Sequence, residues 1–250
     1  METPTINDLS ICVATENGSG SASANNILFK AIFKMGIPCS SKNMFPSNIQ
    51  GLPTWYQIRA SAEGYLGRKD VIDVMVMFND VTAAKDIHRV RDGGVILYDD
   101  STPLPPHLKR EGVQYLGVPA NKIVQKIIPT SPLRGKQRNM LYVGALAYLF
   151  GIDMETIKAV LEDTFGKKPA VIESNLACID AGYRHMQENG LTQDIARFQS
   201  IPNGNKGKII TEGNTACALG TIYGGVSFVA WYPITPSSSL AESIEYYLPR

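Results

Sequence analysis

Apolar runs typical of buried strands alternate with segments of helical periodicity over most of this 250-residue chain. The strand-like runs cover residues 9–14, 54–62, 71–78, 93–100 and 113–119. Apolar side chains recur at helical spacing over residues 24–36, where Gly36 is expected to end the helix, and again between residues 137 and 189. Strands that alternate with helices predict an α/β domain, doubly wound and Rossmann-like.

The pattern changes in the last quarter of the chain. Residues 191–210 carry a Pro-Asn-Gly-Asn-Lys-Gly tract and no strong period, which predicts a linker. A small-residue helix (211–225), an apolar strand (226–231) and a last helix follow. About forty residues are too few to make a core of their own. We therefore expect a first domain over residues 1–190, then the linker, then the beginning of a second α/β domain over residues 211–250.

The composition is that of an ordinary globular protein. A net charge of +1, with acidic and basic residues interleaved, argues against nucleic acid or an anionic membrane as partner. The N-terminus METPTINDLS lacks the features of a signal peptide, and the chain has no apolar run of about 18 residues, so a cytoplasmic protein is expected. The four cysteines lie far apart, which predicts reduced structural thiols and no metal or iron–sulfur site built by this chain alone.

The stretch ATENGSGSAS places Gly18 and Gly20 after a strand and before a helix. Glycines there let backbone N–H groups approach an anion at the helix N-terminus. The match to G-x-G-x-x-G is incomplete because Ser23 takes the third glycine position, and no acidic residue near position 40 is placed to hold a ribose, which argues against a nicotinamide oxidoreductase. A tight turn that needs glycine only for its geometry remains an equal alternative.

Arg59 is a lone basic residue inside the apolar stretch PSNIQGLPTWYQIRAS. It is either an arginine at a strand edge that pairs with a surface carboxylate, which the strand pattern favours slightly, or a guanidinium that faces an anionic ligand. His88, His107 and His185 have no partner at triad or metal spacing and are expected on surfaces or helix faces.

The stretch YPITPSSS is the most distinctive in the chain. Pro233 and Pro236 fix φ on both sides of the two residues between them. Such a turn holds the Thr235 hydroxyl and the following serines at a helix N-terminus, where they either cap the helix or face a ligand. On physical grounds alone the favoured interpretation is a capped strand-to-helix turn, with Ser237 or Ser238 as the N-cap.

This stretch and the one before it resemble the opening of the thiamine diphosphate-dependent α domain of 2-oxoacid:ferredoxin oxidoreductases. That domain begins with a G-N-x-A helix and reaches a Y-P-I-T-P-S-S turn, and both stand here at the family's separation, as residues 213–216 and 232–238. The upstream chain resembles the γ domain of the same enzymes, at NGSGSAS and at PSNIQGLPTWYQIRAS. The γ-before-α order is similar to the α subunit of 2-oxoglutarate and related 2-oxoacid oxidoreductases.

The resemblance implies roles for particular residues. Thr235 corresponds to the catalytic threonine beside the thiamine ring and the substrate, and Pro233 to the proline that precedes it. The γ domain helps to enclose coenzyme A. The hypothesised contacts with it are Arg59 and the backbone of Gly18, Ser19, Gly20 and Ser21. The glutamate that activates thiamine and the arginine that binds the substrate carboxylate are expected beyond residue 250, so the chain is expected to be a truncated product or fragment that is inactive alone.

The reaction implied by the resemblance is the CoA-dependent oxidative decarboxylation of a 2-oxoacid, with 2-oxoglutarate favoured, to acyl-CoA and CO2 with reduction of ferredoxin. Thiamine diphosphate with Mg²⁺ and a 4Fe–4S cluster are expected mainly in a partner β subunit, in a heterodimer. A non-catalytic α/β binding module that docks to a larger complex is the alternative from another class. It predicts no thiamine- or CoA-dependent redox activity.

Overall fold

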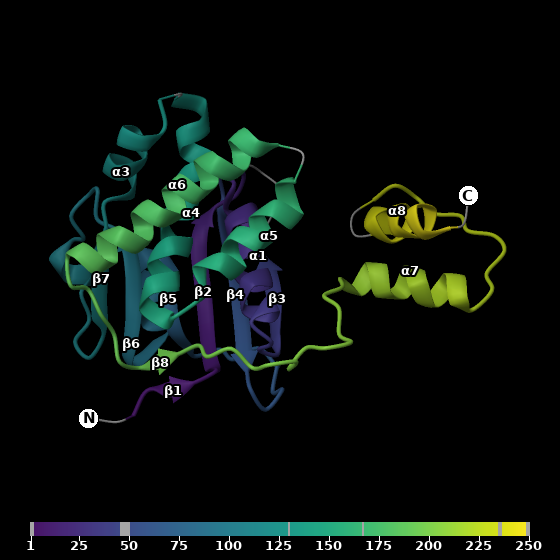
Figure 1. Cartoon of the computed structure of the whole chain (residues 1–250), viewed down its shortest axis with the longest axis horizontal. Helices are drawn as coiled ribbons and strands as arrows, with labels where there is room; N and C mark the ends of the chain where they lie inside the picture. Colours follow the sequence, from purple (N-terminus) through teal and green to yellow (C-terminus); the bar gives the residue numbers. More distant parts are fainter. Residues whose placement is uncertain (1–2, 46–50, 130, 167, 235–236, 249–250) are drawn as a thin grey trace. The chain divides into compact units, whose positions relative to one another are not determined.

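The structure is a computed structural model that describes residues 3–45, 51–129, 131–166, 168–234 and 237–248 (Figure 1). The chain divides into two compact units, Met1–Lys206 and Gly207–Arg250. The division falls near the end of the stretch expected to be a linker, so most of that stretch belongs to the first unit.

A six-stranded sheet forms the centre of the first unit, in the order β3-β4-β2-β5-β6-β7. The strands are β2 (Asp8–Glu16), β3 (Cys39–Met44), β4 (Pro53–Ser61), β5 (Ile72–Met77), β6 (Val90–Asp99) and β7 (Gln114–Val118). Strands β2, β5, β6 and β7 are parallel, whereas β4 is antiparallel to both of its neighbours. All five apolar runs form strands. The pattern missed β3, whose sequence CSSKNM is polar because it lies partly exposed at the sheet edge.

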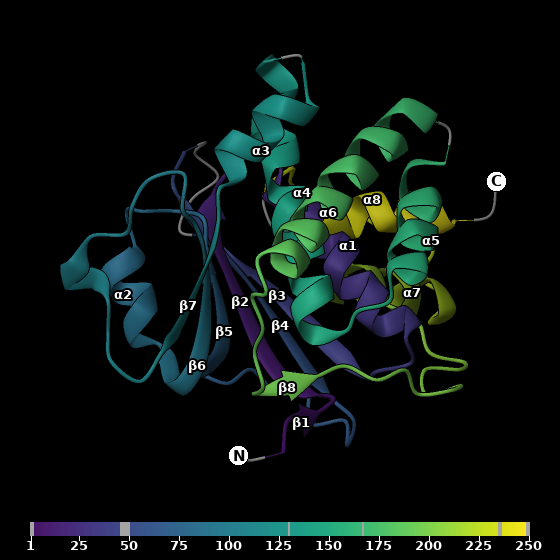
Figure 2. The same ribbon diagram turned by 60° about the vertical axis from the view of Figure 1, so that its left-hand side comes forward.

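Helices cover both faces of the sheet, which confirms the expected doubly wound α/β fold (Figure 2). One face carries α1 (Ser21–Lys34), α3 (Ala120–Ile127), α4 (Ser131–Phe150), α5 (Met154–Phe165) and α6 (Pro169–Glu188), and the other carries α2 (Ala83–His88) and the 3-10 helix η1 (Pro106–Leu108). Successive side chains of β2 point to opposite faces of the sheet and so contribute to the cores on both faces. Ile11 and Val13 pack under the larger layer, while Cys12 and Ala14 pack with α2.

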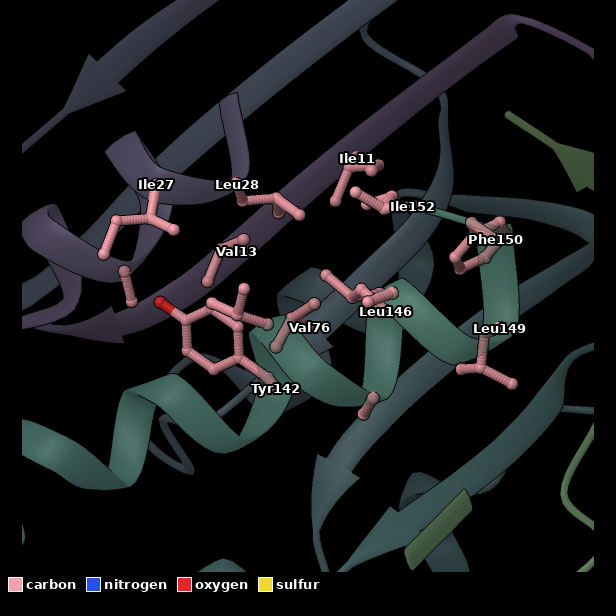
Figure 3. Close-up of a cluster of buried hydrophobic side chains, with 14 of the residues drawn as sticks. Ile11, Val13, Ile27, Leu28, Val76, Tyr142, Leu146, Leu149, Phe150 and Ile152 are labelled. Carbon is pink, nitrogen blue, oxygen red and sulfur yellow. The ribbon is translucent and has the colours of Figure 1, made fainter. Parts of the chain in front are cut away.

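The main core lies between the sheet and the larger helical layer. Figure 3 shows Ile11, Val13 and Val76 of the strands, Leu28 of α1 and Leu146 of α4 in one cluster. All five side chains are fully buried. Each such burial contributes about 1.5–3 kcal/mol to folding, so this interface supplies much of the first unit's stability.

Helices α4 and α6 cross with their backbones in contact. A Cβ atom on Gly144 of α4 would overlap the carbonyl oxygen of Ile179, and one on Gly182 of α6 would overlap that of Leu141. A residue with a side chain does not fit at either position without movement of the backbone. The two glycines therefore set how closely α4 lies against α6.

Residues 191–206, most of the expected linker, are fastened to the first unit. Strand β8 (Ala196–Arg197) pairs in parallel with β1 (Thr5–Ile6). The buried Phe198 donates its backbone N–H to the carbonyl oxygen of Phe150 at 2.7 Å. The expectation of a linker does not hold for these residues. Single apolar side chains such as Phe198 are buried in the first unit, and isolated apolar residues produce no helical or strand periodicity in the sequence.

The last part of this stretch is anchored at the end of α1. Gly36, with a φ of 81°, follows the helix as expected, and a Cβ atom on it would overlap the carbonyl oxygen of Ile201. The Asn205 amide donates to two backbone carbonyl oxygens at this end of α1, each at 2.9 Å. The chain therefore leaves the first unit, after Lys206, from a fixed position.

Arg59 lies near the C-terminal end of β4, opposite Ser10 near the N-terminal end of the antiparallel strand β2. Its side chain is 3% exposed, and its Nη1 atom is 2.5 Å from Oδ1 of Asp8, which Lys69 also approaches at 3.7 Å. The hydrogen bond from Arg59 holds the pKa of the Asp8 carboxyl below its usual value. The interpretation of Arg59 as the partner of a carboxylate agrees with this geometry.

The second unit contains α7 (Gly213–Tyr223) and α8 (Ser237–Tyr247), the two helices that the sequence predicted. The predicted strand at residues 226–231 is not present in the unit as described. A strand needs a neighbour with which to exchange backbone hydrogen bonds, and the residues of this segment, such as Phe228 at 81% exposure, lie in the open.

The glycine crossing of α4 and α6 gives a first prediction. Gly144→Ala should destabilise the chain by about 2–3 kcal/mol, because the new Cβ forces the helices apart. Gly135→Ala in the same helix, where a Cβ meets nothing within 4 Å, should instead stabilise it by about 0.5–1 kcal/mol. Urea unfolding followed by circular dichroism measures both. Equal effects of the two substitutions would contradict the proposed constraint.

A second prediction concerns acid stability. Because the pKa of Asp8 is lower in the folded chain than in the unfolded chain, its ion pair stabilises the fold above the ordinary carboxyl pKa of about 4 and is lost as the pH falls through the folded value. Asp8→Asn should lower the free energy of unfolding at pH 7, and the difference from wild type should shrink towards pH 3. Asp70→Asn, at a side chain 99% exposed, is the control and should run parallel to wild type at every pH.

Candidate functional site

The candidate site of the first unit lies outside the carboxyl ends of β2 and β5. From these adjacent parallel strands the chain passes to opposite faces of the sheet, into α1 after β2 and into α2 after β5 (Figure 2). Doubly wound sheets bind their ligands at such a switch point. The loops that meet there are residues 17–20 and 78–82.

The loop between β2 and α1 depends on its two glycines. Gly18 and Gly20 have φ values of 82° and 84°, a left-handed conformation that other residues adopt at a cost. Gly20 is the N-cap of α1, and behind it the buried Thr15 hydroxyl donates to the Ser21 hydroxyl oxygen at 2.9 Å. The first turn of this 14-residue helix has no acidic side chain. Its partial positive charge is therefore available to an anion.

The first turns of α4 pack directly on this glycine loop. A Cβ atom on Gly20 would be 3.1 Å from Cα of Lys136, and the Lys136 side chain is exposed beside the loop. Asn139, buried one turn later, donates from Nδ2 to the carbonyl oxygen of Ser19 at 2.8 Å. Sequence reasoning missed both α4 residues, since they lie far from the loop in the chain. The available signal was the basic and polar start RGKQRN of an otherwise apolar helix.

The stretch PSNIQGLP also reaches the glycine loop. The Asn17 backbone N–H donates to the Leu52 carbonyl oxygen at 2.8 Å, and the Gly51 N–H donates to the Asn17 carbonyl oxygen at 2.9 Å. Residues 46–50 lie outside the described part of the chain. The stretches NGSGSAS and PSNIQGLPTWYQIRAS, which carry the family resemblance, are therefore joined by backbone hydrogen bonds at this edge of the sheet.

Arg138 joins α4 to the ends of β5 and β6. Its guanidinium lies 5.6 Å from the centre of the Phe78 ring and donates to the Phe78 carbonyl oxygen at 3.2 Å. It is also 3.7 Å from Oδ2 of Asp99, whose other oxygen accepts the backbone N–H of Ala120 at the start of α3. The charge of Arg138 is therefore balanced by Asp99. Lys136 is the basic residue of α4 that lies next to the glycine loop.

A cavity of about 220 Å³ lies at the same edge of the sheet, on the face of α2. Met77, Tyr98, Pro105 and Leu108 give it a mostly apolar wall, and Asp80 of the loop after β5 adds a carboxylate. The pKa of Tyr98 is raised by burial and by the nearby Asp100 carboxylate. Apolar recesses with a few polar groups are typical of sites for organic ligands.

Arg59 does not belong to this site. It lies opposite Ser10, whereas the glycine loop follows Glu16, six residues further along the same strand. At 3.3 Å per residue the separation is about 20 Å. Arg59 of β4 and the glycine loop after β2 therefore lie at opposite edges of the sheet, and a contact of both with one ligand, which would have to be about this long, stays a prediction.

The distinctive turn of the second unit is only partly described. Thr235, the predicted catalytic residue, and Pro236 lie outside the described residues. Pro233 is exposed, and the turn around it is closed by Ser237, whose hydroxyl donates to the carbonyl oxygens of Tyr232 and Ile234 at 2.8 and 2.7 Å. Ser237 is the first residue of α8, so its hydroxyl closes the turn from inside the helix and does not act as the N-cap.

The G-N-x-A helix and the turn meet in the second unit. Asn214 of α7 donates from Nδ2 to the Ser239 hydroxyl oxygen of α8 at 2.7 Å. The hydroxyl of Thr215, the next residue of α7, lies 3.2 Å from that of Ser243, which is one turn after Ser239 in α8. Side chains near the start of α7 therefore touch the first turns of α8, which places the two motifs at the same end of the helix pair.

The cysteines do not form a cluster site in the part of the chain that the structure describes. Burial raises the pKa of Cys12 to about 11 and that of Cys39 to about 12, so both thiols stay protonated, which makes them poor ligands. Cys178 is buried as well, and Cys217 is exposed in the other unit. Across the described ranges, no three Cys, His, Asp or Glu side chains gather at metal-binding distance. An iron–sulfur cluster does not fit the described residues.

Among the described segments, none of the helices combines the length and the apolar character needed to cross a bilayer.

Comparison with known proteins gives the family of the chain. The model of the pyruvate ferredoxin/flavodoxin oxidoreductase family matches residues 10–185. Among solved structures, 2-oxoglutarate:ferredoxin oxidoreductase from Magnetococcus marinus, with 2-oxoglutarate, coenzyme A and succinyl-CoA bound, superposes with a TM-score of 0.85 at 32% identity, over 97% of this chain and 42% of that one. Pyruvate oxidoreductase subunit PORC from Thermotoga maritima shares the fold, with a TM-score of 0.58 at 22% identity over 71% of this chain and 96% of that one.

Curated relatives agree with the structural match. Subunit alpha of 2-oxoacid:ferredoxin oxidoreductase 2 from Aeropyrum pernix is 23% identical over 95% of this chain and 43% of its own length. The 2-oxoglutarate oxidoreductase subunit KorA from Mycobacterium tuberculosis is 24% identical over 76% of this chain and 32% of its own. The chain thus spans less than half the length of these relatives. The family match includes the glycine loop and the start of α4, and it confirms the predicted resemblance: the chain belongs to the pyruvate ferredoxin/flavodoxin oxidoreductase family.

Proposed function

We propose that the chain is part of a 2-oxoacid:ferredoxin oxidoreductase, which converts a 2-oxoacid and coenzyme A to acyl-CoA and CO2 and passes the electrons to ferredoxin. The observation that carries the proposal is the structural likeness over 97% of this chain to an oxidoreductase of this kind. That structure contains 2-oxoglutarate, coenzyme A and succinyl-CoA, which supports 2-oxoglutarate as the substrate. The relative from Mycobacterium tuberculosis, named for the same substrate, points the same way.

In this proposal the first unit corresponds to the γ domain and contributes to the coenzyme A site. Coenzyme A carries phosphate groups, and the N-terminus of α1 offers backbone N–H groups and a partial positive charge for one of them. The missing side chains of Gly18 and Gly20 let a phosphate approach the backbone, and Lys136 adds a cation beside the same loop. The apolar cavity at the same edge is suited to a less polar part of the molecule.

The second unit then corresponds to the beginning of the thiamine diphosphate-binding α domain. Bound thiamine diphosphate would supply a carbanion that attacks the keto carbon and accepts the electrons of decarboxylation. Pro233 and Thr235 are proposed to lie beside it. The contact of Asn214 with Ser239 supports this assignment, because it fixes the two motifs of that domain against each other.

A partner β subunit is proposed to hold the Mg²⁺ ion, most of the thiamine diphosphate site and the 4Fe–4S cluster that passes electrons to ferredoxin. The dispersed cysteines of this chain, three of them at least partly buried, support the placement of the cluster elsewhere. A non-catalytic binding module has no observation of its own in its favour.

The complete complex that contains this chain should reduce methyl viologen under anaerobic conditions in the presence of CoA and 2-oxoglutarate. A panel of pyruvate, 2-oxoglutarate and 2-oxoisovalerate decides the substrate, and 2-oxoglutarate should give the highest kcat/KM. A higher value with another acid would replace the substrate and keep the reaction. No reduction with any of the acids, despite bound thiamine diphosphate and cluster, would refute the proposed function.

Lys136→Ala in that complex should raise the Kd for coenzyme A about two- to fivefold, because an exposed charge next to a phosphate is worth roughly 0.5–1 kcal/mol. Lys158→Ala, at an exposed lysine of α5, is the matched control and should leave the Kd unchanged. Isothermal titration with coenzyme A measures both. Loss of affinity only in the control variant, or in neither, would remove Lys136 from the site.

A further inference from the structure

We infer that Asn139 is a positioning residue, which turns the Ser19–Gly20 peptide so that the Gly20 N–H points to the bound anion. This rests on the proposed function, since the anion is taken to be a phosphate group of coenzyme A. The argument begins with three residues on one face of α4 at intervals of three: Lys136, Asn139 and Tyr142. Each of them touches the glycine loop or the start of α1.

The contact of Asn139 has a defined chemical direction. The Ser19 carbonyl oxygen can only accept a hydrogen bond, so the amide atom 2.8 Å from it must be Nδ2. The same Nδ2 atom is 3.3 Å from the Ser19 hydroxyl oxygen. Asn139 is 1% exposed, and its Oδ1 atom is buried without a hydrogen-bond partner in the described structure. The side chain therefore acts on the loop through its donor alone.

This hydrogen bond determines where the next N–H points. In a trans peptide the C=O of one residue and the N–H of the following residue point in opposite directions. With the Ser19 oxygen turned towards α4, the Gly20 N–H is directed away from that helix. The φ of 84° at Gly20 and its contact with the Lys136 backbone hold the peptide in this orientation.

The unpartnered Oδ1 atom shows that the Asn139 amide is placed for its donor and not for its acceptor. A buried polar atom without a partner costs about 1–3 kcal/mol, and the contacts of Nδ2 with Ser19 are what offset that cost. Tyr142, three residues after Asn139 on the same face, is paired by comparison, because its hydroxyl donates to Oδ1 of Asn25 at 2.8 Å between two buried residues. Tyr142 therefore fastens α4 to α1, whereas Asn139 sets the loop.

The test uses Asn139→Ala and Asn139→Asp in the complete complex. Both remove the donor, and the aspartate also places an acceptor against the Ser19 oxygen. The KM for coenzyme A should rise by about tenfold in the alanine variant and further in the aspartate variant. The kcat and the KM for the 2-oxoacid should stay as in wild type, because the second unit is untouched.

Tyr142→Phe is the matched control, since it removes a buried hydrogen bond from the same helix face. It should lower Tm at least as much as Asn139→Ala while leaving the KM for coenzyme A unchanged. An unchanged KM in both Asn139 variants, or an equal rise with Tyr142→Phe, would overturn the positioning role and leave the proposed function standing. A wild-type complex that neither binds coenzyme A nor depends on it would overturn both. If the complex with Asn139→Asp does not assemble, the KM of the Asn139→Ala complex for coenzyme A is the deciding measurement.

Discussion

The close backbone contact of α4 with α6, at Gly144 against Ile179 and at Gly182 against Leu141, is the constraint on which the larger helical layer depends. Neither position has room for a Cβ atom, so α4 lies against α6 at the distance of two touching backbones. Helix α4 also lies over the sheet, where Leu146 joins the cluster of Ile11 and Val76. Its position is therefore fixed from two sides, and its rotation about its own axis is fixed with it.

That rotation gives α4 its second role. The face that carries Leu141 and Gly144 meets α6, and another face presents Lys136 and Asn139 to the glycine loop. A loop built from glycines has many accessible conformations when it is free. Here α4, which the core holds in place, contacts the loop through Lys136 and Asn139, so the packing of apolar side chains helps to set the direction of backbone N–H groups at the candidate site.

Much of the fold followed from the sequence, because buried strands of a parallel sheet leave continuous apolar runs. The glycine loop and the two motifs of the second unit were also visible, since their residue types are demanded locally by φ or by proline. Lys136 and Asn139 were not, because they act across the fold through single contacts without a period. Arg59 shows the converse: its residue type suggested a ligand, and only the strand register revealed Asp8 as its partner.

Helix α1 has a different function at each end. Its N-terminus forms the glycine loop, and its C-terminus is held by Asn205 just before the chain leaves the first unit. With 14 residues at 1.5 Å each, the helix is about 21 Å long. It thus sets the distance between the glycine loop and the Asn205 anchor within the first unit. Insertion or deletion of one helical turn in α1 would shift one against the other by about 5.4 Å.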